Sequence, residues 1–436
     1  MHLMKQLRYT IACLSGLSAS FLSRFLKLGA GATWPGEIAL RMYPQILATL
    51  SKRIRKGIII IAGTNGKTTT SGMTSAILRH AGYSVLHNTS GANLLNGIIS
   101  SFFVSWRLVD FAVFEVDENA FAKILPFIHP KAIVLLNLFR DQLDRYGEVD
   151  TIAAFWRSSL QSFDDKTTIL ANGDDPTIAV MTEKLRSRVV YFGLEDPKYY
   201  LPKMQHATDS IYCPKCGTRL TFGGVYFSHL GKWACGACGF THPDVLIQSS
   251  DYTSPLEGVY NIYDTLAAAS VGEVLRIDKG EIQQALDQFT PAFGRMESIA
   301  YQGKTIRILL SKNPTGFNES LRTILASSQK GPIMLLLNDR IPDGTDVSWI
   351  WDVDFEQLTE CAYPIIISGD RVYDMAVRMA YIEKKKKQLP LQVVENLSSA
   401  IVAATEAAKE NETIWILATY SAMLDVRKII TGKKIL

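Results

Sequence analysis

The chain has 436 residues, 47% of them hydrophobic and 20% charged, and its formal net charge is +4 at pH 7. This is the composition of a globular protein, and the length predicts about three domains. The small net charge argues against a nucleic-acid-binding protein with a broad basic face. No apolar stretch of the sequence is long and charge-free enough for a transmembrane helix.

Residues 1–54 are predicted to form a helical N-terminal segment. Lys5 and Arg8 precede an apolar run, residues 9–22, that imitates a secretory signal peptide. Arg24 follows that run directly, and the chain then continues into a loop whose expected ligand is a cytoplasmic nucleotide. We therefore interpret the segment as an amphipathic helix of a cytoplasmic protein. Its basic and apolar character also suits a place at the inner face of the membrane.

A glycine-rich turn follows the apolar strand that we predict over residues 58–61. The turn and the start of the next helix contain seven candidate nucleotide-binding residues: Gly63, Thr64, Asn65, Gly66, Lys67, Thr68 and Thr69. Such a turn directs backbone N–H groups at a phosphate and places a helix N-terminus beneath it. We expect Lys67 to reach the β- and γ-phosphates of ATP and Thr68 to hold Mg²⁺. The general pattern has a further glycine where this chain has Ile61, and the alternative is a strand–turn–helix without a ligand.

The residues after this turn alternate between apolar strands and helices. Further strands are predicted over residues 84–87, 111–116 and 132–136, with a helix starting at Lys67 and another near Leu94. Apolar strands without an alternating pattern indicate a parallel sheet that is covered on both faces. The sequence therefore predicts an α/β fold.

Three carboxylates, Glu115, Asp117 and Glu118, stand at the end of one predicted strand. Ligands gather at the carboxyl ends of strands in open α/β sheets, and a carboxylate there can hold Mg²⁺ beside the phosphates. Acidic residues at strand ends are also common as exposed turn residues. The residues alone leave both interpretations open.

A cysteine-rich insert interrupts the alternation at about residues 205–245. It contains two Cys-x-x-Cys pairs, Cys213 with Cys216 and Cys235 with Cys238, each followed by glycine. Four thiolates on two such turns suit tetrahedral Zn²⁺ in a closed structural site, whereas a redox dithiol needs only one pair. Some zinc ribbons bind nucleic acid, but this insert has no dense basic cluster, so we expect a structural zinc ribbon.

A second α/β segment follows a helix predicted over residues 256–275. Its strands are predicted over four ranges: 306–310, 333–337, 365–367 and 414–417. We therefore expect a central P-loop ATPase domain over residues 55–292, with the zinc ribbon inside it. A C-terminal Rossmann-like α/β domain is expected over residues 293–436.

The loop at residues 63–69 resembles that of the Mur ligases and the folylpolyglutamate synthases. Three further segments resemble the Mur ligases: Asn-Leu followed by acidic residues and glycine at 137–147, Gly-x-x-Asn at 258–261 and Gly-Arg-x-Glu at 294–297. The resemblance implies a Mur ligase-like fold and an ATP-dependent ligase.

The resemblance also implies roles for individual residues. Glu115 matches a carboxylate that holds Mg²⁺ in the family, and Asn261 and Asp264 lie in the segment that contacts the adenine. Arg295 matches an arginine that meets the γ-phosphate, and Lys312 stands where the family places a lysine or histidine. A cation there stabilises charge that develops on the transferred phosphoryl group.

Two departures from the family affect a second Mg²⁺ site. Gln142 replaces a histidine ligand, and no lysine lies between Asp144 and Lys166, where many members carry a carbamylated lysine. The number of Mg²⁺ ions is therefore left open by the sequence.

Within this family the chain resembles the ATP-using subunits of lipid II isoglutaminyl synthases. The resemblance rests on the short segment before the loop in place of a UDP-sugar domain, on the cysteine pairs and on the sequence at 338–356. It implies that ATP phosphorylates the α-carboxylate of D-Glu in the lipid II stem peptide, and that ammonia attacks the acyl phosphate to give D-isoglutamine. It also implies a heterodimer with a glutaminase of the GatD type, which supplies the ammonia, and a lipid II substrate at the membrane surface.

Asp346 matches the residue that, in this resemblance, orients the catalytic histidine of the glutaminase. The alternative is that Asp346 only caps the next helix. Two other functions remain open: a Mur-type ligase that adds an amino acid instead of ammonia, and a zinc-ribbon ATPase that binds nucleic acid. The small net charge argues against the second, and we expect no nucleic-acid partner.

Overall fold

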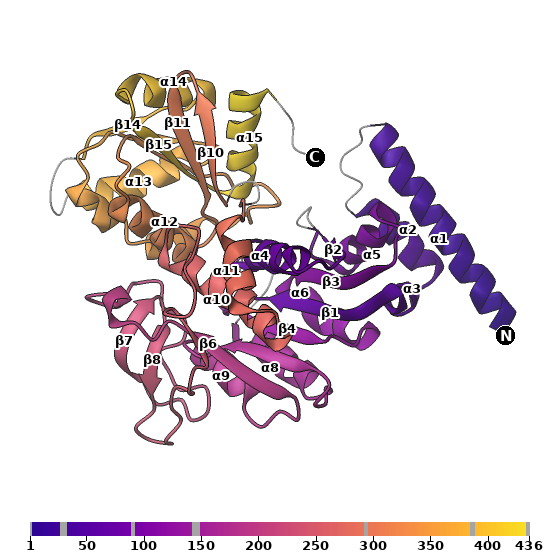
Figure 1. Cartoon of the computed structure of the whole chain (residues 1–436). Coiled ribbons are helices and arrows are strands. Elements are labelled where there is room, and N and C mark those ends of the chain that lie inside the picture. Colours follow the sequence, from indigo (N-terminus) through magenta and orange to yellow (C-terminus); the bar gives the residue numbers. More distant parts are fainter. Residues whose placement is uncertain are drawn as a thin grey trace.

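The computed structural model of the chain describes residues 2–26, 33–88, 92–141, 149–291, 295–383 and 389–432. Two α/β units, each built on a mainly parallel sheet, make up most of the molecule (Figure 1). A cysteine-rich insert lies at the lower left in that view, and the N-terminal helix lies at the right-hand edge.

The first sheet has seven strands in the order β2-β3-β1-β4-β5-β6-β9, and neighbouring strands are parallel. The strands are β1 (Ile54–Ala62), β2 (Val85–His87), β3 (Val109–Val116), β4 (Ala132–Leu135), β5 (Thr168–Asn172), β6 (Arg188–Gly193) and β9 (Ile247–Gln248). β1 lies between β3 and β4, so the strand order changes direction at its carboxyl end. Open α/β sheets bind their ligands at such a switch point.

Both faces of the first sheet are covered, as its apolar strands predicted. Ile58 and Ile60 of β1 face one core, and Ile59 and Ile61 face the other. The first core includes α1 (His2–Phe25), α2 (Trp34–Met42), α3 (Ile46–Leu50), α5 (Leu95–Val104), α6 (Glu118–Ile124), α8 (Val149–Leu160) and α9 (Pro176–Thr182). The second core includes α4 (Lys67–His80), α10 (Val259–Val274), α11 (Lys279–Asp287) and part of the insert.

The second sheet has six strands in the order β10-β11-β15-β12-β13-β14. They are β10 (Arg295–Tyr301), β11 (Lys304–Leu310), β12 (Ile333–Leu336), β13 (Ile365–Ser368), β14 (Leu391–Val393) and β15 (Thr413–Ala418). Only the pairing of β10 with β11 is antiparallel. One face packs against α12 (Pro314–Ala326) and α13 (Val372–Glu383), and the other against α14 (Leu397–Ala407) and α15 (Tyr420–Thr431).

The insert forms an antiparallel pair, β7 (Thr221–Phe227) with β8 (Leu230–Ala234). It is joined to the first unit through buried Asp174. The carboxylate of Asp174 accepts hydrogen bonds from the Tyr263 hydroxyl at 2.5 Å and lies 2.7 Å from His242 Nε2. These contacts hold the insert against α10 and the end of the first sheet.

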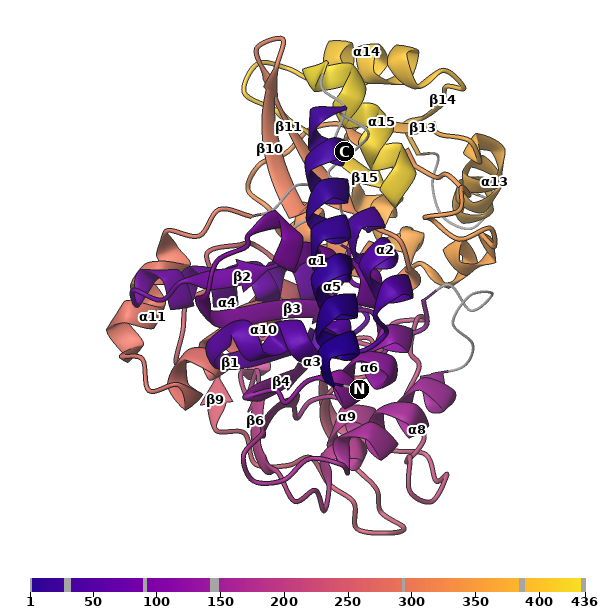
Figure 2. The same ribbon diagram turned by 90° about the vertical axis from the view of Figure 1, so that its right-hand side faces the viewer.

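The N-terminal segment is helical, as predicted. α1 packs on α2 and α5 at the outside of the first unit (Figure 2). Gly16 allows the close approach, because a Cβ atom there would lie 2.5 Å from the Phe103 ring. Among the residues that the structure describes, no helix has the length and apolar character needed to cross a membrane.

Candidate active site

The predicted phosphate loop lies at the switch point, between β1 and α4. Asn137, which follows β4, fixes its shape. The Asn137 Oδ1 accepts the Asn65 backbone N–H at 2.9 Å, the Asn137 Nδ2 donates to the Asn65 carbonyl at 3.2 Å, and the Asn137 carbonyl accepts the Thr64 N–H at 3.0 Å. Since two loop N–H groups bond to Asn137, a phosphate would instead meet the N–H groups in the first turn of α4.

Gly66 ends the loop in a left-handed conformation, with φ of +90°. A Cβ atom at Gly66 would lie 2.1 Å from Asp264 Oδ1, so only glycine fits against α10 here. Asp264 is buried, and its Oδ1 also accepts the Thr70 hydroxyl at 3.2 Å. Asp264, predicted from its segment to bind the nucleotide, thus also positions the loop.

Lys67 is a buried side chain at the start of α4. Its Nζ donates to the carbonyl oxygens of Gly63 and Thr64, the latter at 3.1 Å, and forms an ion pair with Glu118 Oε2 at 3.2 Å. Burial opposes the charge of Glu118, but the charges of Lys67 and Lys312 outweigh it, so the pKa of Glu118 is lowered. Glu118 therefore stays ionised and holds Lys67 beneath the loop.

Lys312, just after β11, brings a second cation to this place from the other α/β unit. It forms an ion pair with the buried Asp141, which follows β4. Burial raises the pKa of Asp141, and the Lys312 charge opposes that effect. The two lysines therefore share a cluster of buried carboxylates, with one lysine supplied by each unit.

The three carboxylates after β3 have different surroundings. Asp117 caps α6 by accepting the Asn119 N–H at 3.0 Å, and Glu118 pairs with Lys67. Glu115 is buried and pairs in the sheet with Ile61, just before the loop. Asn88 bonds both to its backbone N–H at 3.0 Å and to its carbonyl at 2.9 Å. Glu115 thus has a fixed place at the end of β3.

Thr68 and Glu115 are the predicted Mg²⁺ ligands. Thr68 is half-buried in the first turn of α4, and Glu115 is buried at the end of the strand next to β1. A hydroxyl and a carboxylate beside a phosphate cradle are the oxygen ligands that Mg²⁺ prefers. The residues present therefore fit the ion, and their role remains a prediction.

A cavity that is partly open to solvent lies beside the loop and between the two units. Asn65, Gly66 and Thr69 line it from the loop and α4. Five further lining residues come from α10, β10 and β11: Tyr260, Asn261, Tyr263, Met296 and Leu309. This mixture of apolar and amide groups suits a flat heterocycle whose phosphates reach α4.

Asn261 is buried in the cavity wall, in the first turn of α10. Its Nδ2 donates to the Glu257 carbonyl at 2.5 Å and contacts Met296 Sδ at 3.6 Å. Of the other predicted residues, Arg295 opens β10, but its side chain lies outside the described part of the chain, as does Gln142.

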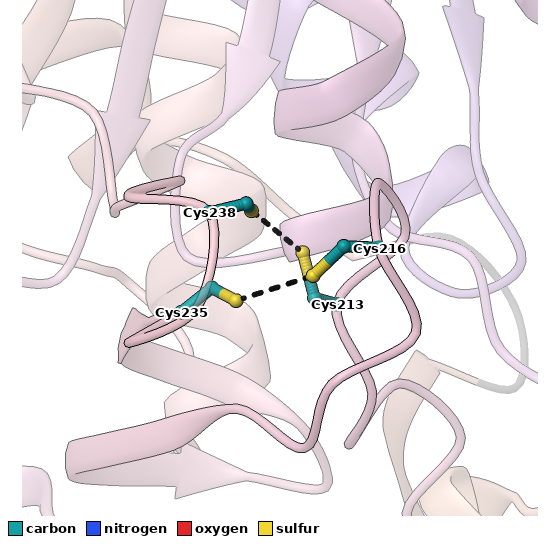
Figure 3. A group of neighbouring side chains, drawn as sticks. All are labelled: Cys213, Cys216, Cys235 and Cys238. Carbon is teal, nitrogen blue, oxygen red and sulfur yellow. Dashed lines mark hydrogen bonds between the residues drawn. The ribbon is translucent and has the colours of Figure 1, made fainter.

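The four cysteines of the insert come together (Figure 3). Cys213 Sγ lies 3.6 Å from Cys238 Sγ, and Cys216 Sγ lies 3.5 Å from Cys235 Sγ. Thiolates at the corners of a zinc tetrahedron are about 3.8 Å apart, given Zn–S bonds of about 2.3 Å. The four side chains therefore fit a tetrahedral ion.

The two cysteine turns have the same backbone geometry. Gly217 N–H donates to the Cys213 carbonyl at 2.9 Å, and Gly239 N–H donates to the Cys235 carbonyl at 3.1 Å. Both glycines have positive φ, +74° and +71°. Glycine is favoured at these two positions because L side chains rarely adopt that conformation.

Asp346 is exposed, in a surface groove of the second unit that Trp351, Arg371 and Tyr373 also line. Its carboxylate accepts the Ser348 N–H at 2.8 Å and the Ser348 hydroxyl at 3.0 Å. These hydrogen bonds lower the pKa of Asp346. The side chain is thus an accessible anion that also stabilises the turn at Ser348–Asp352, so both predicted roles stay open.

Two family models match the chain: a Mur ligase middle domain over residues 61–272 and a MurT ligase C-terminal domain over residues 310–423. The chain is 32% identical to the MurT subunit of the lipid II isoglutaminyl synthase (glutamine-hydrolyzing) of Streptococcus pneumoniae R6, over 98% of both chains. It is also 32% identical to the corresponding subunit of Staphylococcus aureus COL, over 81% of this chain and 83% of that one.

The chain belongs to the MurT family. The resemblance to Mur ligases is thereby confirmed, and this member of the MurT family is an ATP-dependent ligase that forms an amide bond.

Solved structures confirm the fold. A pseudomurein peptide ligase type C from Methanothermus fervidus superimposes with a TM-score of 0.65 at 23% identity, over 88% of this chain and 80% of that one. MurF ligase from Thermotoga maritima, solved in complex with ADP, gives 0.63 at 14% identity, over 90% of this chain and 84% of that one. At these identities the likeness shows the Mur ligase-like fold alone.

Sequence reasoning missed Glu319 of α12, a buried carboxyl group in the cavity wall. Its Oε1 accepts Gln205 Nε2 at 3.3 Å, and its Oε2 lies 3.7 Å from Arg322 Nη1. Burial raises the pKa of Glu319 to about 7, and Arg322 offsets only part of that effect. No motif marks this residue, because its burial depends on the packing of the two units.

We predict that Glu319→Gln makes the stability of the folded chain less sensitive to pH. The folded-state pKa lies above the usual value for glutamic acid, so the stability it contributes is complete at low pH and is lost as the pH rises through about 7. Between about pH 5.5 and pH 8, the free energy of unfolding of the wild type should fall by about 2 kcal/mol more than that of the variant. Urea unfolding at both pH values measures this, and an equal loss in both proteins would contradict it.

Proposed function

We propose that the chain amidates the α-carboxylate of D-Glu in the stem peptide of lipid II. A carboxylate oxygen attacks the γ-phosphorus of ATP, and the bond to ADP breaks, giving an acyl phosphate. Ammonia then attacks the acyl carbon, inorganic phosphate leaves, and a proton is lost. The names of both MurT relatives support this substrate and product.

The observation that carries the proposal is the meeting of Lys67 and Lys312 at buried carboxylates. Phosphoryl transfer needs positive charge around the transferred group, already fixed in place. One lysine lies under the phosphate loop and the other comes from the second unit. The pair therefore suits a reaction in which nucleotide and acceptor are held by different units.

Other residues have narrower proposed roles. Thr68 and Glu115 hold Mg²⁺, which would neutralise charge on the phosphates. Asn261 and Asp264 border the adenine site, and Arg295 would contact the γ-phosphate. The three motif residues Gly63, Gly66 and Thr69 shape the loop and the adjoining wall of the cavity.

The ammonia is proposed to come from a GatD-type glutaminase bound at the groove around Asp346. The words "glutamine-hydrolyzing" and "subunit" in the names of the relatives support a partner of this kind. Asp346 is an exposed carboxylate, so it can accept the imidazole N–H of a partner's catalytic histidine. Trp351 is 47% exposed and suits the interface. Trp349 is partly buried against Phe317, so it is less available to a partner.

The direct test combines the chain with a GatD-type glutaminase, glutamine, ATP and lipid II. Mass analysis of the stem peptide should show one hydroxyl replaced by one amino group. ATP hydrolysis should rise with lipid II and not with DNA or RNA. Stimulation by a free amino acid instead of ammonia would favour an amino-acid-adding ligase.

Lys67→Ala is expected to abolish amidation with glutamine and with free ammonium, because both routes need the acyl phosphate. Glu118 would also lose its buried partner, so the folded state must be checked by circular dichroism. Arg79→Ala, at the far end of α4, is the matched control and should keep activity. Amidation by folded Lys67→Ala at the wild-type rate would refute the loop assignment.

Asp346→Asn is expected to lose glutamine-dependent amidation and keep ammonium-dependent amidation. Asparagine can still accept the Ser348 N–H, so the turn should persist, but the negative charge that stabilises an imidazolium is gone. Ser348→Ala is the control: it removes only the hydroxyl contact and should keep both activities. Asp343 is unsuitable as a control because it is buried against Ser421. Unchanged glutamine use by Asp346→Asn in an intact complex would rule out this role.

One structural Zn²⁺ is proposed on Cys213, Cys216, Cys235 and Cys238. Protein purified without added zinc should contain about one equivalent per chain. Cys216→Ser should lose most of that zinc and make the insert sensitive to protease, since metal binding and folding are coupled. Cys361→Ser, outside the cluster, should change neither. A folded, protease-resistant insert without metal would contradict the proposal.

A further inference from the structure

The outer face of α1 carries a stripe of large apolar side chains. Helical spacing places seven of them on one side: Met4, Leu7, Ile11, Leu14, Phe21, Leu22 and Phe25. Their exposure runs from 41% for Ile11 to 73% for Phe25. Figure 2 shows α1 running along the front of the molecule.

The inner face of α1 has mainly small residues, beside the partly buried Tyr9 and Leu17. Ala12, Cys13, Gly16 and Ser20 are buried there, where α1 packs on α2 and α5. A surface helix of a globular protein usually turns its large apolar residues to the core and its polar residues outward. α1 instead turns the seven residues of the stripe outward, so its packing within the described part of the chain does not explain them.

This end of the chain is also strongly basic. Residues 1–56 contain nine lysines and arginines and a single acidic residue, Glu37, which is a net charge of +8 in a chain whose total is +4. The residues after position 56 therefore carry a net negative charge. α1 itself has no acidic residue, and its Lys5 and Arg8 are exposed. A partner of complementary character has an anionic surface over an apolar layer.

We infer that α1 lies in the surface of an anionic lipid bilayer, with its apolar stripe below the headgroups. Helices with one large apolar face and basic flanks bind membranes in this way, by apolar burial and by attraction to anionic lipid. A second copy of the chain is a poorer occupant, since it would bring two strongly basic segments together. The groove at Asp346, where the glutaminase is proposed to bind, lies far from α1. α13 helps to line that groove, and it lies on the opposite side of the molecule from α1 in Figure 1.

The apolar face of α1 would be a docking surface in addition to the proposed active site. It deepens the proposed function, because the lipid-linked substrate of that reaction lies in a membrane. The binding itself does not depend on the reaction. It can therefore be measured with vesicles that contain no lipid II, and failure of either idea leaves the other testable.

The test is co-sedimentation of the full chain with vesicles. Phosphatidylcholine vesicles with about a third phosphatidylglycerol should bind the chain, pure phosphatidylcholine should bind it less, and added salt should weaken the binding. The triple variant Leu7→Gln, Ile11→Gln, Phe21→Gln should reduce partitioning into anionic vesicles by about tenfold or more. These side chains are exposed, so the fold should persist, and circular dichroism checks this.

The matched control is Leu246→Gln, Val393→Gln, Val402→Gln, which removes three exposed apolar side chains elsewhere. It should bind vesicles as the wild type does. Failure of the wild type to bind anionic vesicles, or equal binding by the α1 variant, would overturn the inference. Self-association that the α1 variant abolishes, without vesicle binding, would assign the face to a second copy and would also overturn it.

Discussion

Two lysines, the buried Lys67 and the partly buried Lys312, come one from each α/β unit and are held by buried carboxylates at a single place. Lys67 pairs with Glu118, and Lys312 pairs with Asp141, while the charge of Lys312 also lowers the pKa of Glu118. Removing one partner of a buried ion pair commonly costs about 3–5 kcal/mol, because the remaining charge is desolvated and uncompensated. The relative position of the two units therefore depends on this balance of charge. Phosphate groups have the same sign as the carboxylates and would compete with them for both lysines.

The insert contributes to the candidate active site, although its four cysteines lie outside that site. Asp174 joins the insert to α10 through His242 and Tyr263. Tyr263 and Phe227, the last residue of β7, line the cavity beside the phosphate loop. The cysteine cluster thus belongs to a subdomain that forms part of the cavity wall. A change at the cluster should therefore be felt in the cavity through packing, without any direct contact.

Much of the fold could be predicted because its signals are local. The strand at β1, the turn after it and the helix start at Lys67 occupy one short stretch of sequence, and the four apolar strands predicted in the second unit correspond to β11, β12, β13 and β15. β14 has three residues and β9 two, so neither gives a pattern that can be recognised. β10 mixes polar and apolar residues at the edge of its sheet, and it was missed for that reason.

The site was predicted less completely, because its contacts join distant segments. The sequence drew attention to three carboxylates after β3, but it did not show that Asp117 caps a helix while Glu118 neutralises Lys67. Asn137 lies in a segment identified by resemblance, yet its bonds to the loop depend on how β4 lies beside β1. Asn65 and Asn313 are far apart in the chain, and their side chains meet only when the two units pack together.

The contact between Asn65 and Asn313 has a mechanical consequence. Asn313 Oδ1 accepts Asn65 Nδ2 at 3.4 Å and also caps α12 by accepting the Gly316 N–H at 2.8 Å, while its Nδ2 donates to Asn65 Oδ1 at 3.1 Å. The cap holds the amide in one rotamer whether or not Asn65 is present. If the two units separate and pack together again, the Asn313 side chain therefore loses little conformational entropy when it meets Asn65, because the cap already holds its rotamer.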